Sequence, residues 1–145
     1  RGANLPSMTD FENPYPALRE MEAVPLFVKL GYRFTGAGDG WAEITFTASD
    51  KTSNLYGIVH GGVWLFLADS AMGGALGTVA EPDERVITVQ SEFRWLRPLQ
   101  SPTIRAHARV LRRGRTVSHC TVDLFDEDDR LIGTSNGTYV IQPPA

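Results

Sequence analysis

Residues 54–69 read NLYGIVHGGVWLFLAD. A His-Gly-Gly turn opens a segment that is apolar on nearly every side until Asp69 interrupts it. A helix that is apolar all round is a buried helix, so this pattern predicts a buried central helix over residues 62–79. An ionised carboxylate in such a place is costly unless it is paired, hydrated or functional. Asp69 is therefore the first candidate for a functional residue.

The chain on both sides of this helix alternates between apolar and polar residues, as half-buried strands do. Within residues 103–111, for example, Ile104, Ala106 and Ala108 share one face. The same reasoning predicts strands over residues 31–35, 41–47, 86–95, 103–111, 116–125 and 131–141. Short strands joined by tight turns imply an antiparallel sheet. One long helix with such a sheet predicts an α+β domain.

Proline, glycine and side-chain alternation give finer expectations. Pro25 is expected to break a short helix over residues 17–30, and the glycine-rich run 36–40 is expected to be a turn. One face of the strand over residues 86–95 is expected to hold Ile87, Val89, Phe93 and Trp95. The central helix contains glycines that each cost ~1 kcal/mol relative to alanine. We therefore expect a curled sheet to pack closely against Gly73, Gly74 and Gly77.

Length and composition limit the possible classes of protein. With 145 residues, the chain is expected to form a single domain over residues 11–145, after a disordered or vector-derived segment over residues 1–10. The net charge of −3 argues against a nucleic-acid partner. The apolar run over residues 63–76 is too short to span a membrane, and no signal peptide is visible. The single Cys120 fits a reducing compartment, so we expect a cytoplasmic protein.

The spacing Asn54-x-x-Gly57-x-x-His60-Gly61-Gly62, followed by Ala68-Asp69, resembles the hotdog-fold acyl-CoA thioesterases. The branch it resembles most is the phenylacetate-pathway, or PaaI-like, type. Residues 88–98 and 111–116 continue the similarity, which covers residues 31–140. The resemblance implies a hotdog fold, in which an antiparallel sheet wraps around one long helix. It also implies hydrolysis of an aromatic or medium-chain acyl-CoA to free acid and CoA.

Helix geometry adds an argument about assembly. A helix rises ~1.5 Å per residue, so the Cα atoms of Gly61 and Asp69 are about 12 Å apart if both are helical. One thioester carbonyl and its attacking water span only a few ångströms. We therefore expect a second subunit to complete the site, with Asn54, His60 and Gly61 from one chain and Asp69 and Thr88 from its partner. The resemblance implies the same arrangement, in a homodimer or a homotetramer.

Each residue of the motif has an expected role beside a structural alternative. The Gly61 N–H, with that of Gly62, would hold the thioester oxygen at the positive end of the helix. Asp69 would act as a general base on water, or attack directly to give a mixed anhydride; a structural acid is the alternative. His60 would orient the loop or the thioester, or serve only as a structural histidine. Asn54 would hold water or the carbonyl, or form an Asx turn. Thr88 would bond Asp69 or the water, or be an ordinary strand residue.

The remaining expectations concern substrate contacts and cofactors. Coenzyme A carries phosphates, which suit arginine, so the candidates for contact with it are Arg94, Arg97, Arg112, Arg113 and Arg115. Three scattered histidines make a metal site improbable. No cofactor is expected, since CoA is part of the substrate.

Two other functions compete with thioester hydrolysis. One is a hotdog hydratase or dehydratase, which resembles a different motif with a histidine and an acid both working on the acyl carbons. The other is a catalytically silent acyl-CoA-binding module, against which the intact Asp69 argues. The sequence leaves open which acyl group is cleaved and whether CoA or a carrier protein bears it.

Overall fold

The computed structural model describes residues 11–144, so the expectation for residues 1–10 lies outside the described residues. The helices are α1 (Pro16–Ala23), α2 (Pro25–Leu30) and α3 (Gly61–Gly77), with a short 3-10 helix, η1 (Asp50–Thr52). The strands are β1 (Arg33–Gly38), β2 (Trp41–Thr47), β3 (Arg85–Trp95), β4 (Thr103–Arg113), β5 (Val117–Phe125) and β6 (Leu131–Gln142). As expected, Pro25 separates two short helices.

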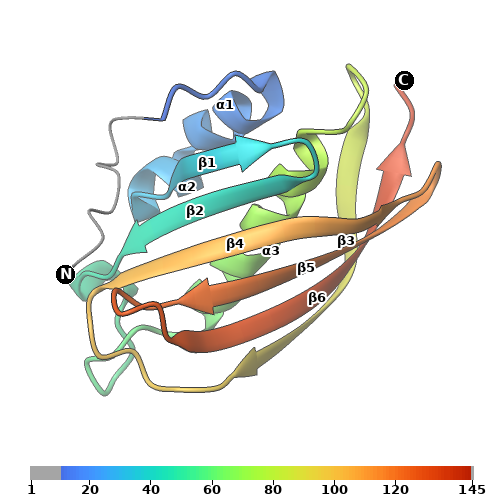
Figure 1. The fold of residues 1–145 in the computed structure, drawn as a ribbon. Coiled ribbons are helices and arrows are strands. Elements are labelled where there is room, and N and C mark those ends of the chain that lie inside the picture. Colours follow the sequence, from blue (N-terminus) through green and yellow to red (C-terminus); the bar gives the residue numbers. More distant parts are fainter. Residues whose placement is uncertain (1–10, 145) are drawn as a thin grey trace.

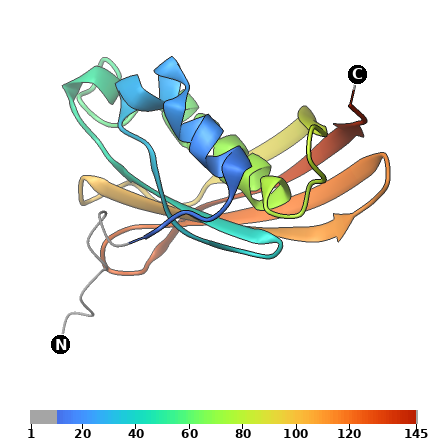
Figure 2. The same cartoon turned by 90° about the horizontal axis from the view of Figure 1, so that it is seen from above.

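The strands form one antiparallel sheet in the order β1-β2-β4-β5-β6-β3, which curls around α3 (Figure 1). Seen from above, the helices gather on one face of this sheet (Figure 2). The predicted α+β architecture is therefore confirmed. Strands β1 and β3 are the two edges, because each pairs with a single neighbour in the described chain. No helix among the described residues is long and apolar enough to cross a membrane.

The core lies between α3 and the concave face of the sheet. Leu67, Ala71 and Ala75 of α3 are fully buried, as are the inward residues of β2 and β4, namely Ala42, Ile44, Phe46, Ile104, Ala106 and Ala108. A Cβ on Gly74 would lie 2.5 Å from the ring of Phe34, and one on Gly77 would lie 3.2 Å from Ala17. A Cβ on Gly73 would meet nothing within 4 Å. Of these three glycines, the sheet therefore packs closely against Gly74 alone. Gly77 instead lies against α1, so the expectation that the sheet covers Gly73 and Gly77 is wrong.

Strand β3 differs from its predicted pattern because it contains a β-bulge. Thr88 pairs with Tyr139 and Gln90 pairs with Thr138, so Val89 is the extra residue. A bulge reverses the alternation of side chains that follow it. Thr88 and Phe93 consequently both face α3, whereas Ile87 and Val89 are exposed. The expectation that Ile87 shares a face with Phe93 is wrong for this reason.

A second difference lies in the predicted turn over residues 36–40. Strand β1 continues through Gly36 to Gly38, and only Asp39 and Gly40 form the turn. The ring of Trp41 covers this part of β1, at 3.1 Å from a Cβ built on Gly36. The glycines are therefore strand residues that make room for an indole ring, and Gly40, with φ at 81°, makes the turn.

Candidate active site

Helix α3 begins with a histidine cap. His60 has extended backbone angles, and its Nδ1 accepts a hydrogen bond of 2.9 Å from the Gly62 N–H. The neutral ring therefore carries its proton on Nε2, which is left to donate elsewhere. Among the described residues nothing accepts a hydrogen bond from the Gly61 N–H. The expected pair of oxyanion donors is thus reduced to one, because the cap occupies Gly62.

Asn54 organises the loop that leads into this helix. Its Oδ1 accepts hydrogen bonds from Tyr56 N at 2.9 Å and from Ile58 N at 3.3 Å. This is the Asx-turn geometry that was the structural alternative for Asn54. The side-chain amide nitrogen, Nδ2, donates to no described residue. Asn54 can therefore shape the loop and still offer a donor to a ligand.

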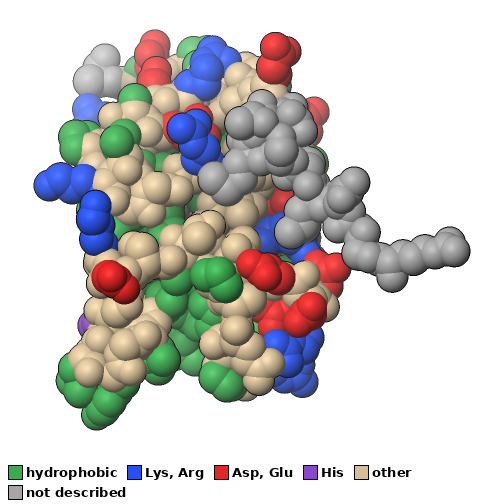
Figure 3. Space-filling view, turned by 90° about the vertical axis from the view of Figure 1, so that its left-hand side faces the viewer, with side chains coloured by type: hydrophobic (Ala, Val, Ile, Leu, Met, Phe, Trp, Pro, Cys, Tyr) green, Lys and Arg blue, Asp and Glu red, His purple; other side chains and the backbone are tan. Residues whose placement is uncertain are grey.

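A cleft of about 730 Å³ lies beside Asn54 and Gly61. We call it the Gly61 cleft. One wall is the loop before α3, and the other is formed by Trp95 and residues 96–102. Trp95 passes close to the helix start, at 3.6 Å from a Cβ built on Gly61. Figure 3 views this side of the molecule, where hydrophobic side chains are visible inside a hollow.

Asp69 lies further along α3 and is held by two hydroxyl groups. Thr88 Oγ1 and Tyr139 Oη each donate to Asp69 Oδ1 at 2.9 Å. Burial, followed by the nearby charge of Asp69, raises the pKa of the Tyr139 phenol, which therefore remains a proton donor. Neither hydroxyl engages the other carboxylate oxygen, Oδ2. We call these three residues the Asp69 cluster.

Asp69 is not fully buried within the single chain, although its hydrogen-bond donor Tyr139 is buried. Asp69 is partly exposed, on a stripe of α3 that also contains Gly62, Leu65 and Gly73. The expectation of a helix buried on every side is thus wrong, since one stripe faces away from the sheet. Leu65 is exposed on this stripe and Gly73 leaves open space above the backbone, so another surface can approach the helix closely here.

The Gly61 cleft and the Asp69 cluster remain apart in one chain. Both use α3, but the residues that line the cleft include neither Asp69 nor Thr88. The rise of a helix places Gly61 and Asp69 about 12 Å apart. The structure therefore joins Asn54 with Gly61, and Asp69 with Thr88, as two separate groups.

The candidate arginines do not gather at one place. Arg97 lines the Gly61 cleft, whereas Arg94 pairs with Glu92. Arg113 pairs with Glu84. The β4–β5 hairpin contains Arg112, Arg113 and Arg115. Figure 1 shows this hairpin at the end of the sheet opposite the loop before α3. Within one chain, only Arg97 is placed for a ligand in the cleft.

Two residues of the site were missed at the level of sequence. Tyr139 donates to Asp69, and Trp95 forms part of the cleft wall. A signal for Tyr139 existed, because alternation in β6 puts Ser135, Gly137 and Tyr139 on the inner face. A buried tyrosine hydroxyl needs a polar partner, and the only acid on the central helix is Asp69.

Comparisons with known proteins agree with this architecture. A sequence model of the thioesterase superfamily matches residues 56–132. The 1,4-dihydroxy-2-naphthoyl-CoA hydrolase of Escherichia coli is 27% identical over 112 residues, which cover 77% of this chain and 82% of that protein. The chain belongs to the thioesterase superfamily, and its fold is the hotdog fold. It is accordingly a thioester hydrolase by family.

Two solved structures show how far the similarity of fold extends. A thioesterase from Haemophilus influenzae superposes with a TM-score of 0.80 at 25% identity, covering 86% of this chain and 87% of that one. The phenylacetic acid degradation protein PaaI from Thermus thermophilus superposes with a TM-score of 0.73 at 23% identity, covering 80% and 97%. At this level of identity, the similarity to PaaI is one of fold alone. Structures of the PaaI-like type are thus among those that share the fold of this chain.

Proposed function

We propose that the chain hydrolyses an acyl-CoA thioester to the free acid and CoA, with Asp69 as the catalytic acid-base group. The observation that carries this proposal is the Asp69 cluster, in which two hydroxyls hold Oδ1 and leave Oδ2 for a water molecule. Oδ2 takes a proton from water as its oxygen attacks the carbonyl carbon. The carbon–sulfur bond then breaks, and the thiolate of CoA leaves and takes up a proton.

The same carboxylate permits a second route. Oδ2 attacks the carbonyl carbon, CoA leaves as thiolate, and water then opens the resulting mixed anhydride. Detection of ¹⁸O in the Asp69 carboxylate after a single turnover in ¹⁸O-water establishes the anhydride route. The anhydride route places ¹⁸O in the Asp69 carboxylate when water attacks there, whereas the general-base route places it only in the released acid.

The Gly61 N–H is the proposed oxyanion donor. It lies at the N-terminus of a 17-residue helix, where the helix dipole favours negative charge. Asn54 lines the cleft and has Nδ2 as a further donor, and the Nε2–H of His60 is a donor at the start of the helix. The apolar wall near Trp95 excludes water and so strengthens these interactions with the developing oxyanion. The proposed mechanism uses only these donors and Asp69, and it includes no cofactor.

We further propose that a second copy of the chain brings the two groups together. Strand β3 is a sheet edge that carries the exposed side chains of Ile87 and Val89. Beside it lies the open stripe of α3, where Gly73 leaves room for close approach. Pairing along this face in a homodimer, or in a homotetramer built from such dimers, would place the Asp69 of one protomer opposite the Gly61 of its partner.

The substrate range that fits the cleft is aromatic or medium-chain acyl. Trp64, Trp95 and Leu99 give it an apolar lining, and Arg97 supplies a positive charge for the phosphates of CoA. These features favour acyl-CoA over a substrate without phosphate groups.

A panel of aryl-CoA and aliphatic acyl-CoA thioesters tests the proposal through the release of free thiol. We expect turnover on at least one class, with the free acid and CoA as products. Tight binding of acyl-CoA without turnover on any member would instead indicate an acyl-CoA-binding module. Conversion of the acyl chain without thiol release would indicate a hydratase or dehydratase.

A further inference from the structure

Residues 96–102 form a wall of the Gly61 cleft that has little backbone support of its own. Its start is fixed because Leu96 N and Arg97 N both donate to Ile132 O, at 2.9 and 3.2 Å. Its end is fixed by the hydrogen bond of 2.7 Å from Ala48 N to Pro102 O. Between these points, residues 98–101 make no backbone–backbone hydrogen bond in the described structure.

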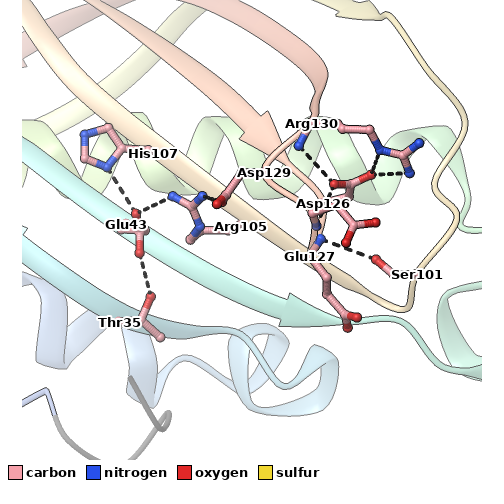
Figure 4. A network of polar contacts seen from close by, with 10 residues as sticks. Thr35, Glu43, Ser101, Arg105, His107, Asp126, Glu127, Asp129 and Arg130 are labelled. Atoms are coloured by element: carbon pink, nitrogen blue, oxygen red, sulfur yellow. Dashed lines mark hydrogen bonds and ion pairs between the residues drawn. The ribbon is translucent and has the colours of Figure 1, made fainter. Parts of the chain in front are cut away.

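Contacts from another part of the chain hold this middle section. Arg130 Nη2 donates a hydrogen bond of 2.7 Å to Gln100 Oε1, and Glu127 N donates one of 3.4 Å to Ser101 Oγ. Both donors belong to the β5–β6 turn over residues 126–130. Figure 4 shows this turn beside Ser101. The β5–β6 turn thus supports the middle of the cleft wall, which has no backbone hydrogen bonds of its own there.

The β5–β6 turn is suited to this role because Asp126 makes it rigid. Its side chain is 1% exposed and accepts hydrogen bonds from Asp128 N at 2.9 Å, Arg130 N at 3.0 Å and Arg130 Nε at 2.8 Å. Burial acts to raise the pKa of Asp126, but these hydrogen bonds outweigh it and hold the pKa below its usual value. The carboxylate therefore stays charged and keeps the Arg130 guanidinium aimed at Gln100.

We propose that the β5–β6 turn sets the position of the cleft wall for substrate binding, with Arg130 and Gln100 as positioning residues. The inference deepens the proposed function and rests on it. We call the support of the wall by Arg130 and Gln100 the brace. Because residues 98–101 contain neither a proposed oxyanion donor nor the base, the brace acts on how substrate binds rather than on the chemical step. Loosening it should raise KM and leave kcat nearly unchanged.

Gln100→Met tests the proposal, since it keeps the length of the side chain and removes the acceptor. We expect KM for acyl-CoA to rise about tenfold, with kcat within about twofold of wild type, because the wall loses its hydrogen bond to a charged group. Gln100→Glu keeps an acceptor for Arg130 and is the control for the position of the wall in hydrogen exchange, since its negative charge would itself weaken binding of the CoA phosphates. Asp129→Asn is the matched control, because Asp129 lies in the same turn but pairs with Arg105 on the outer face.

Hydrogen exchange supplies a readout that does not depend on activity. We expect the amides of residues 99–101 to exchange faster in Gln100→Met and at the wild-type rate in Gln100→Glu and Asp129→Asn. Unchanged exchange and unchanged KM in Gln100→Met would overturn the brace, as would a loss of kcat with KM unchanged. Absence of turnover by the wild type is a different result, which would refute the proposed function while exchange still decides whether the brace exists.

Discussion

Asp69 owes its proposed reactivity to the way its two oxygens differ. Thr88 and Tyr139 both donate to Oδ1, which fixes the carboxylate plane and leaves Oδ2 as the free acceptor. Thr88 could be predicted from the sequence through the family resemblance, because the similarity continues over residues 88–98. Tyr139 could not be found that way, since it lies 70 residues from Asp69 and meets it only when β6 packs against α3.

The Gly61 amide gives a prediction at the level of a single atom. Gly61→Pro removes the proposed oxyanion donor and should lower kcat by about 10²–10³. Proline suits the first position of a helix, and the preceding His60 already has the extended backbone, with ψ at 134°, that a following proline requires. Thiol release under saturating substrate measures the effect.

Gly61→Ala is the control for that substitution, because it retains the N–H. A Cβ there would lie 3.6 Å from the Trp95 ring, which is ordinary contact, so we expect activity near that of wild type. Equal rates for the proline and alanine variants would show that the Gly61 N–H does not bind the oxyanion.

At the scale of elements, α3 serves two purposes with two stripes. One stripe packs into the sheet, and the other presents Gly62, Leu65 and Asp69 outward. The position and approximate length of this helix, and of most strands, could be predicted from apolar periodicity. The bulge at Val89 could not, because its cause is pairing with β6 rather than a local residue preference. That bulge is what allows Thr88 and Phe93 both to face α3.

Close packing of α3 on the sheet predicts the effect of adding a methyl group. Gly74→Ala places a Cβ 2.5 Å from the ring of Phe34, and we expect it to destabilise the fold by about 1–3 kcal/mol, despite the better helix propensity of alanine. Urea unfolding measures this change. Replacing the Phe34 ring by Phe34→Leu should reduce the loss of stability that Gly74→Ala causes. An equal loss of stability with Phe34 and with Phe34→Leu would refute the packing argument.

For the whole molecule, the main consequence is that one chain holds two incomplete halves of a site. The Gly61 cleft offers donors and an apolar wall, and the Asp69 cluster offers the base. Sequence reasoning could predict this separation, because helix rise alone puts the two residues about 12 Å apart. The position of the cleft wall depends on the β5–β6 turn, which is distant in sequence. It could not be predicted, because no motif in the sequence connects this turn with the wall.

Mixing two inactive variants tests whether the halves come from different protomers. If each site combines the Gly61 of one chain with the Asp69 of its partner, mixed dimers of Gly61→Pro and Asp69→Asn contain one intact site. Random exchange of subunits should then restore about a quarter of wild-type activity. A mixture that stays inactive, with mixed dimers verified by mass, would place both residues in the site of a single chain.

Thiol release by wild type and Asp69→Asn on the same substrate tests directly whether Asp69 acts on the thioester. Asp123→Asn serves as a control, because Asp123 is a strand carboxylate that accepts a hydrogen bond from Thr134 outside the site. We expect Asp69→Asn to lose about 10²–10⁴ in kcat with its circular dichroism unchanged, and Asp123→Asn to retain activity. An Asp69→Asn variant that turns over thioesters at the wild-type rate would show that Asp69 takes no part in hydrolysis.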